Sequence, residues 1–146
     1  MSKAKMTEEE KLLKLRISDL KKNLQTLVNK YVRYRDTNNG TKGNCISCGR
    51  EIIYGDSKCQ AGHYIDCGAN GRLRFDLFNL NGQCCNCNAF NNGNKLGYRE
   101  GLIKKYGEAK EKELFEGRKD SLSGMDKLDI IQEIIRYKKL FKELGI

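Results

Sequence analysis

Proline, tryptophan, histidine and long apolar runs are scarce or missing in this sequence of 146 residues. It contains no proline and no tryptophan, and its single histidine is His63. No apolar run approaches the roughly 20 residues that a membrane-spanning helix needs, and the charged residues 1–15 contain no apolar stretch typical of a signal peptide. We therefore expect a cytoplasmic protein without a membrane partner, in which thiols stay reduced.

The apolar share of the chain is low for its length. Hydrophobic residues make up 38% of the sequence and charged residues 32%, and the mean hydropathy is -0.70. A chain of this length fits one compact core with helical extensions. So little apolar material favours a core that a metal ion helps to hold. The seven cysteines are the candidate ligands, because paired cysteines in the cytosol more often bind metal than form disulfides.

Positive charge predominates in the sequence. Lysine and arginine number 28 against 19 acidic residues, which gives a net charge of +9 and an isoelectric point near 9.2. This balance predicts a polyanionic partner. Charge alone does not separate DNA from RNA or from a membrane surface, nor does it exclude a merely soluble basic protein.

The N-terminal part of the chain has the pattern of one amphipathic helix. Apolar residues recur at heptad spacing over residues 8–34, and Thr7 with Glu10 predicts a capping box at its start. This stripe packs either within its own domain or on a second copy of the chain, because it needs only one apolar partner. The stripe comprises Leu13, Ile17, Leu20, Leu24, Leu27, Tyr31 and Tyr34.

The middle of the chain differs in composition from both ends. Residues 36–43 are rich in glycine and asparagine, which predicts a loop, and short apolar fragments in residues 44–94 suit brief strands and turns. Helical patterns return from Lys95 to Gly107 and over residues 126–144. We therefore expect an α+β fold that is mainly helical. Its expected parts are an N-terminal amphipathic helix (1–35), a metal-bound core (36–107) and a C-terminal helical segment (108–146).

Four cysteines form two pairs of the Cys-x-x-Cys type. Cys45 and Cys48 make the first pair, and Cys84 and Cys87 make the second. A two-residue spacer lets both sulfurs of a tight turn reach one tetrahedral zinc ion at about 2.3 Å, and Gly49 supplies the turn after the first pair. Two such pairs predict a closed, structural zinc site, because no coordination position is left for water.

Three cysteines remain outside these pairs. Cys59, Cys67 and Cys85 have no comparable partner, and we expect each to behave as a small buried hydrophobic residue. Cys85 is an alternative ligand to Cys84, although its one-residue spacer to Cys87 makes a poorer chelate.

The single histidine lies between the two cysteine pairs. A neutral imidazole can accept a proton from water near pH 7, so His63 is a candidate general base, although a lone histidine is more often structural or solvated. Asn79 precedes the second cysteine pair and Asn88 follows it immediately. This order of residues resembles the HNH (ββα-metal) endonucleases. It consists of a cysteine pair, a histidine on a strand, an asparagine in the next loop and a second cysteine pair that opens a helix. In these enzymes a two-stranded ribbon and a helix hold one divalent ion.

Eight short stretches of the chain carry a closer resemblance. They are residues 31–36, 45–49, 60–64, 73–76, 81–84, 87–88, 93–94 and 98–102. In this order they resemble the bacteriophage lambda NinG recombination-protein family. The resemblance implies a structure-specific nuclease of phage recombination that acts on branched DNA such as a Holliday junction, encoded by a phage or prophage. The chain is also similar to the phage recombination endonuclease VII, in which an asparagine directly after the last zinc cysteine holds the catalytic metal.

These resemblances imply a small zinc-bound ββα-metal (HNH-like) core flanked by amphipathic helices. They imply that His63 is the general base and that Asn88 is a ligand of a catalytic Mg²⁺ or Mn²⁺ ion. That ion acts as a Lewis acid on the phosphate and the departing oxygen. Asn79 fits the position that braces the loop orienting the histidine.

The candidate metal shell departs from the HNH pattern at one position. Many HNH sites have an aspartate directly before the histidine as a second metal ligand, and this chain has Gly62 there. Asn92, one helical turn after Asn88, is a further candidate ligand. Asp66 is another, because it is close to the histidine in sequence.

Basic residues around the site are candidates for contacts with the DNA backbone. A solvated surface charge is the alternative for each of them. No base-reading motif is visible, so we expect binding that depends on DNA shape more than on sequence. The candidates are Arg33, Arg35, Arg72, Arg74, Lys95 and Arg99.

Three functions compete at this point. The first is a metal-dependent endonuclease for branched DNA, and the second is a non-catalytic zinc-ribbon module that binds nucleic acid as a recombination accessory. The third is a less selective HNH nuclease of the homing or restriction type. Paired cuts in a four-way junction need two active sites, so the first function also predicts a two-fold homodimer.

Overall fold

The chain has an α+β fold that is mainly helical, as the sequence predicts, with two short antiparallel strand pairs. In this computed structural model the described residues are 4–66, 71, 73–117 and 125–146. The chain divides into two compact units, residues 1–27 with 125–146 and residues 28–124. Within the described ranges, no helix has the length and apolar character needed to cross a membrane.

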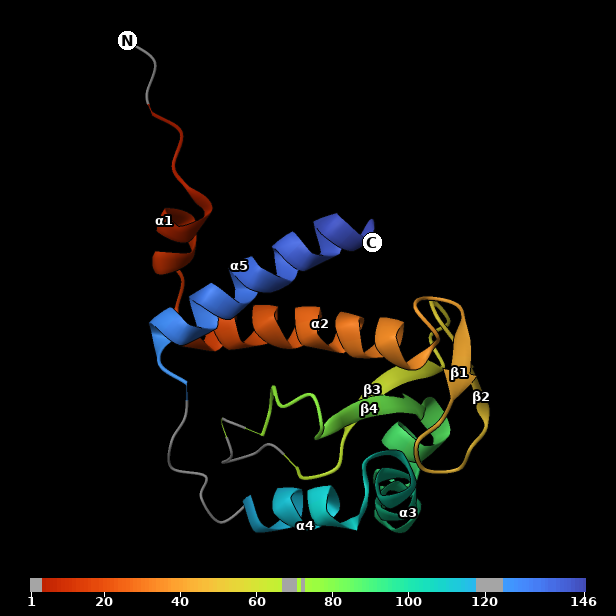
Figure 1. Cartoon of the computed structure of the whole chain (residues 1–146). Helices are drawn as coiled ribbons and strands as arrows, with labels where there is room; N and C mark the ends of the chain where they lie inside the picture. The colour runs from red at the N-terminus through yellow and green to blue at the C-terminus, as the bar shows by residue number, and fades with distance from the viewer. Residues whose placement is uncertain (1–3, 67–70, 72, 118–124) are drawn as a thin grey trace. The chain divides into compact units, whose positions relative to one another are not determined.

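Three helices contribute to the first unit, and one of them, α2 (Ile17–Asp36), continues into the second unit (Figure 1). The other two are α1 (Glu8–Leu13) and α5 (Lys127–Leu144). The predicted capping box is confirmed, because the Glu10 amide donates to Thr7 Oγ1 at 3.2 Å and the Thr7 amide donates to Glu10 Oε2 at 2.8 Å. These bonds satisfy two amides at the start of α1 that have no helical partner.

The prediction of a single helix over residues 8–34 is wrong, because the helix is interrupted between α1 and α2. The amides of Lys14 and Leu15 bond to oxygens three residues earlier, which tightens the last turn of α1 and ends it. Arg16 then starts α2: its carbonyl accepts from the Leu20 amide at 3.0 Å, and its side chain pairs with Asp19. Local hydrogen bonding thus overrides the continuous apolar spacing.

The buried face of α2 steps by four residues and not by a heptad. Leu20, Leu24, Val28 and Val32 are fully buried, whereas Ile17 of the predicted stripe is 43% exposed. A four-residue step follows the i, i+4 ridge of an ordinary helix, whereas a coiled-coil seam repeats every 3.5 residues.

The helix predicted over residues 126–144 is confirmed as α5, although the last apolar residue of its stripe, Leu144, is 39% exposed. Ile130, Ile134, Tyr137 and Phe141 of α5 are buried. Within the first unit α5 also contacts α1, and Lys138 forms an ion pair with Glu8 there. The apolar face of α5 is therefore largely buried in the single chain.

Two strand pairs form the centre of the second unit. Strands β1 (Lys42–Asn44) and β2 (Glu51–Ile53) are antiparallel, as are β3 (Cys59–His63) and β4 (Leu80–Cys84). In the β3–β4 pair, Cys59 lies opposite Cys84 and His63 lies opposite Leu80. The histidine therefore ends one strand, at the opposite end of the ribbon from the second cysteine pair.

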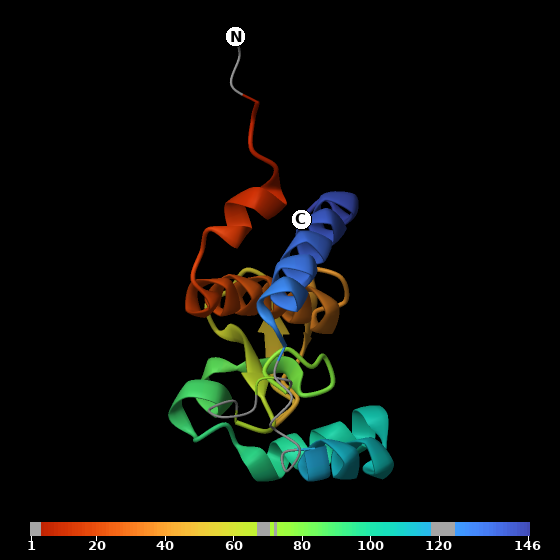
Figure 2. The same ribbon diagram turned by 90° about the vertical axis from the view of Figure 1, so that its left-hand side faces the viewer.

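Three helical segments follow β4. They are η1 (Asn86–Phe90), a short π-helix, then α3 (Lys95–Tyr106) and α4 (Glu108–Gly117), and the last two pack side by side (Figure 2). Helix α3 starts and ends as the sequence predicts. The helical spacing assumed between Asn88 and Asn92 does not occur, because η1 ends at Phe90 and Asn92 has a positive φ of 47°.

Candidate metal centre and active site

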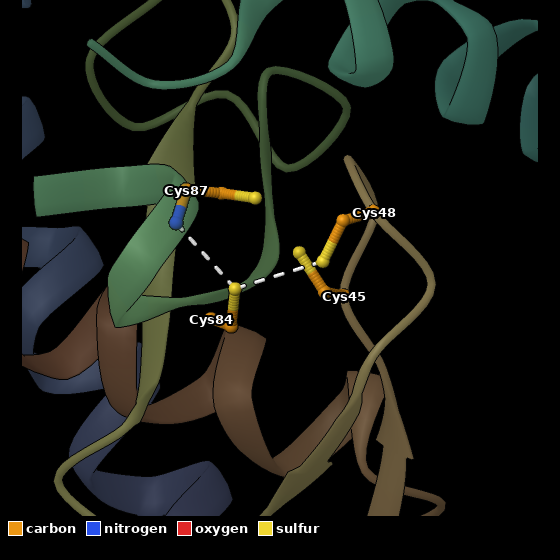
Figure 3. Close-up of side chains that lie close together, drawn as sticks. All are labelled: Cys45, Cys48, Cys84 and Cys87. Carbon is orange, nitrogen blue, oxygen red and sulfur yellow. Dashed lines mark hydrogen bonds between the residues drawn. The ribbon is translucent and has the colours of Figure 1, made fainter. Parts of the chain in front are cut away.

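Four cysteine side chains converge between the β1–β2 turn and the start of η1 (Figure 3). Cys45 and Cys48 come from the turn, Cys84 ends β4 and Cys87 lies in η1. Their sulfur atoms all lie within 4.8 Å of one another, and those of Cys48 and Cys84 are 3.7 Å apart. A tetrahedral zinc ion with bonds of about 2.3 Å separates its sulfur ligands by about 3.8 Å. The predicted cysteine set is therefore a group that can hold zinc.

The local backbone prepares this group for a metal. Gly49 has a φ of 75°, which closes the turn after the first pair, and its amide donates to the Cys45 carbonyl at 2.9 Å. The Cys87 amide lies 3.5 Å from the Cys84 sulfur, and Asn94 Nδ2 lies 3.4 Å from the Cys87 sulfur. Donors aimed at sulfur stabilise its negatively charged form.

Without a cation these thiols do not ionise together. Burial raises the pKa of the Cys45 thiol and raises the pKa of Cys87 to about 12. Burial also acts to raise the pKa of Cys84, but hydrogen bonds from the Cys87 backbone and the neighbouring thiols leave it below its usual value. A divalent cation supplies the positive charge that four adjacent thiolates need, which couples metal binding to folding of this segment.

The other described cysteines lie outside the four-sulfur group. Cys59 is buried against Cys45, Cys84 and Cys87, and burial raises the pKa of its thiol, as expected of a small hydrophobic residue. Cys85 is only half-buried, and its amide donates to the Lys58 carbonyl. Cys67 lies outside the described residues.

His63 is half-buried at the end of β3, and its Nε2 atom lies 2.9 Å from the main-chain oxygen of Arg74. A carbonyl oxygen can only accept, so Nε2 carries the hydrogen and, in the neutral imidazole, Nδ1 is the basic nitrogen. Burial lowers the pKa of His63, and the charges of Lys95 and Arg74 lower it further, against the opposing effects of the Arg74 hydrogen bond and Asp66. The imidazole is therefore neutral at pH 7.

Asn79 braces the segments on either side of this histidine contact. It is fully buried, and its Oδ1 accepts from the Ile65 amide at 2.8 Å. Its Nδ2 lies 3.1 Å from the Ile65 oxygen and 2.9 Å from the Leu73 oxygen. Residue 73 directly precedes Arg74, so Asn79 fixes the backbone next to the carbonyl that orients the imidazole.

Helix α3 holds the same strand end from the other side. The buried Tyr98 hydroxyl lies 2.7 Å from the Gly62 oxygen, and Lys95 Nζ lies 2.6 Å from the His63 oxygen and 2.8 Å from the Tyr64 oxygen. Tyr98 was not singled out from the sequence. Lys95 was predicted to hold DNA phosphate, which stays a prediction; in the structure its ammonium anchors the backbone around the histidine.

Asn88 lies in η1, and its side chain reaches β3. Its Nδ2 donates to Gln60 Oε1 at 2.9 Å, and a Cβ atom added to Gly62 would lie 2.9 Å from its Oδ1. The same Cβ would overlap Oε1 of Gln83. A residue without a side chain at position 62 is thus required by the Gln83 side chain packed over it.

The two further candidate metal ligands are exposed. The Asp66 side chain is 90% exposed and pairs with Lys95 at 3.0 Å. Asn92 is exposed in the turn between η1 and α3. Asn88 alone of the three candidate oxygen ligands lies against β3.

Arg35 has acceptors within the protein for all of its guanidinium nitrogens. It pairs with Asp36 at 2.6 Å and donates to the carbonyls of Leu77 and Leu80 at 2.9 and 2.8 Å. Burial acts to raise the pKa of Asp36, but Arg35 and Lys105 lower it overall, so this carboxylate stays ionised. The Arg35–Asp36 pair therefore ties the end of α2 to β4, an arrangement that sequence reasoning missed.

The remaining basic candidates occupy varied surroundings. Arg33 is half-buried, Arg74 lies 5.5 Å from the Phe75 ring, and Arg99 pairs with Glu111 at 3.4 Å. Arg72 lies outside the described residues. The phosphate contacts of this set stay predictions.

Comparison with known proteins gives a consistent family. Protein ninG of Escherichia phage 933W is 38% identical over 87 residues, and that of Escherichia phage lambda is 37% identical over 87 residues. Protein ninG of Salmonella phage P22 is 38% identical over 86 residues. These segments cover 59 to 60% of this chain, and the chain spans only about two fifths of the length of these curated relatives. No solved structure matches it significantly.

A family model extends the similarity to almost the whole chain. The model described as Bacteriophage Lambda NinG protein matches residues 2–145, which include both cysteine pairs, the histidine and both helical ends. The chain therefore belongs to the bacteriophage lambda NinG protein family.

Proposed function

We propose that this chain is a divalent-metal-dependent DNA endonuclease of the HNH (ββα-metal) class that cuts branched recombination intermediates in the host cytoplasm. The observation that carries the proposal is the state of His63. Its Nε2 donates to the Arg74 oxygen, its pKa is lowered, and no described residue forms a hydrogen bond with its Nδ1. A neutral histidine with one fixed and one open nitrogen is suited to general-base catalysis.

The chain's own residues would supply most of the reaction. Nδ1 of His63 takes a proton from a water molecule, which attacks the phosphorus of the scissile phosphodiester. The Arg74 oxygen then stabilises the positively charged imidazolium through Nε2, and Asn79 keeps that oxygen in place. Lys95 fixes the backbone of His63, so the imidazole does not have to reorganise during the reaction.

Asn88 would hold the catalytic cation. Its Nδ2 is engaged with Gln60, which leaves the amide oxygen on the side facing Gly62. Magnesium and manganese prefer oxygen ligands of this kind, whereas the four-sulfur group suits zinc. When bound, the ion supplies positive charge for the phosphate and the departing 3′ oxygen.

Two features of the chain support a branched nucleic acid as the substrate. The net charge of +9 favours a phosphate backbone. Phe90 is 80% exposed two residues after Asn88, and an exposed ring beside the site can stack on a base that is unpaired at a branch point. The similar ninG proteins come from phages, and DNA recombination produces branches of this kind.

A second candidate function is a non-catalytic zinc-bound module that binds nucleic acid. The observation in its favour is Gly62, because the chain has no carboxylate directly before the histidine. In this reading the hydrogen bond of His63 to the Arg74 oxygen is purely structural. The module would bind branched DNA without cutting it.

One assay separates these candidates. The zinc-loaded chain is incubated with Mg²⁺ and end-labelled four-way junction, flap or plain duplex of the same sequence. The endonuclease proposal predicts cleavage of at least one branched substrate and little cleavage of the duplex. Binding without cleavage would support the module, and equal cleavage of all three would indicate a less selective nuclease.

A further inference from the structure

Gln83 of β4 has a buried amide that is only partly satisfied. Its side chain is fully buried, and its Nε2 donates to the Gly93 oxygen at 2.6 Å and to Ser47 Oγ at 2.8 Å. A main-chain oxygen can only accept, so the Gly93 contact fixes which end of the amide is the nitrogen. The opposite atom, Oε1, is buried and has no hydrogen-bond partner among the residues that the structure describes.

A buried acceptor without a donor is rare in native proteins and points to a missing partner. Gly62 provides only a Cα atom beside this oxygen, which offers at most a weak contact. The oxygen therefore faces a place where a positively charged or donating group is expected.

The side-chain oxygen of Asn88 also faces Gly62. Gln60 donates to the Ser57 oxygen at 3.3 Å, so its Oε1 is the acceptor for Asn88 Nδ2 at 2.9 Å. This chain of contacts turns Asn88 Oδ1 toward Gly62. The Oδ1 of Asn88 and the Oε1 of Gln83 thus both lie beside the position that a Cβ atom of residue 62 would occupy.

We propose that Gln83 is a second protein ligand of the divalent cation and shares it with Asn88. Gln83 reaches from β4 to the place that the side chain of residue 62 would fill on β3, and so its oxygen replaces that of an aspartate at position 62. Two hard amide oxygens and the open side of Asn88 suit Mg²⁺ or Mn²⁺ with several waters. This inference rests on the proposed function for the assignment of Asn88 to the cation.

The test measures Mn²⁺ binding by the zinc-loaded full chain without DNA, using the electron paramagnetic resonance signal of free Mn²⁺. The wild type should bind one Mn²⁺ ion, and Asn88→Ala should weaken this binding. Gln83→Ala and the longer Gln83→Met should each weaken Mn²⁺ binding at least ~10-fold, a typical loss for a metal-site residue. Ser47→Ala is the matched control, because it removes a partner of Nε2 and leaves Oε1 and the Gly93 contact; it should keep nearly full affinity. Zinc content and circular dichroism check that each variant is folded.

A rescue variant separates a ligand from a structural amide. Gly62→Asp combined with Gln83→Ala puts a carboxylate into the space that the glutamine leaves, and Mn²⁺ affinity should return to at least the wild-type level. A structural role for Gln83 predicts no such recovery. Folded Gln83 variants that keep Mn²⁺ affinity, a wild type that binds no Mn²⁺, or a rescue variant without recovery would each overturn the inference.

The two proposals can fail separately. A wild type that binds Mn²⁺ through Gln83 but cuts no DNA would support this inference and contradict the nuclease. A wild type that cuts DNA while the Gln83 variants keep their Mn²⁺ affinity would contradict this inference and leave the nuclease standing.

Discussion

The main-chain oxygen of Arg74 lies 2.9 Å from Nε2 of His63, and this contact orients the imidazole. Eleven positions separate the two residues in the sequence, and between them both Ile65 and Leu73 form hydrogen bonds with Asn79. The four cysteines that can hold zinc lie at one end of the β3–β4 ribbon, whereas Asn79 sets the direction of the histidine at the other end. The effects of mutating the two groups should differ accordingly.

The pH dependence of cleavage should follow the lowered pKa of His63. The base must be unprotonated, so the rate should rise with pH through a value below 6.5 and level off by about pH 7. The same shift makes the unfolded chain bind the proton first, so this histidine's contribution to stability is complete above pH 6.5 and decreases as pH falls. Single-turnover rates between pH 5 and 8 test this, and a limb centred above pH 7 would contradict the assignment.

Asn79→Asp should impair cleavage more than DNA binding. The carboxylate can still accept from the Ile65 amide, but it cannot donate to the Ile65 and Leu73 oxygens and faces them with negative charge. We expect a loss of ~1–3 kcal/mol in the free energy of unfolding, typical of unsatisfied buried groups, and a lower cleavage rate at unchanged affinity for DNA. Urea unfolding and single-turnover cleavage measure the two effects. Unchanged values of both would show that Asn79 braces nothing.

Cys48→Ser should abolish stoichiometric zinc and loosen residues 44–94 together. The substitution removes one of four converging sulfurs, and metal affinity in such a site is part of the folding free energy. Cys85→Ser is the control, because its half-buried thiol lies outside the four-sulfur group and should leave zinc content unchanged. Zinc analysis and amide hydrogen exchange follow both variants. A folded wild type without zinc and with four free thiols at these positions would end this account of the site.

Paired cleavage of a four-way junction predicts a two-fold dimer. Leu20 and Leu24 are buried in the single chain, so the apolar residues of the predicted stripe that remain available include Leu13, 44% exposed, and Ile17, 43% exposed. Leu13→Glu with Ile17→Glu should dissociate such a dimer and spare the fold. Sedimentation equilibrium at micromolar concentration, with and without junction DNA, decides it. A chain of 16.7 kDa that stays monomeric on the junction excludes the dimer.

Local signals in the sequence predict much of this molecule. The spacing within each cysteine pair, the capping residues Thr7 and Glu10 and the stop at Gly107 depend on neighbours in the chain, and all three appear as expected. The break between α1 and α2 was missed because it depends on main-chain hydrogen bonds of Lys14 and Leu15, which apolar spacing does not reveal.

Other features depend on contacts between distant segments. Asp36 accepts from the Gly82 amide, Tyr98 reaches the Gly62 oxygen, and Gln83 covers the face of Gly62. These residues all lie within the stretches that resemble the NinG family, so the sequence draws attention to their positions. Their contacts could not be predicted, because only the folded chain brings such partners together.

The most direct test of the account is the cleavage of branched DNA by His63→Ala, compared with the wild type in Mg²⁺. Single-turnover rates and DNA affinity are measured on the same labelled junction, with zinc content as the check on folding. The account predicts a rate at least ~100-fold lower, typical of a lost general base, with nearly unchanged affinity for the junction. Wild-type cleavage by the folded variant, or no cleavage by the wild type on any branched substrate, would contradict it.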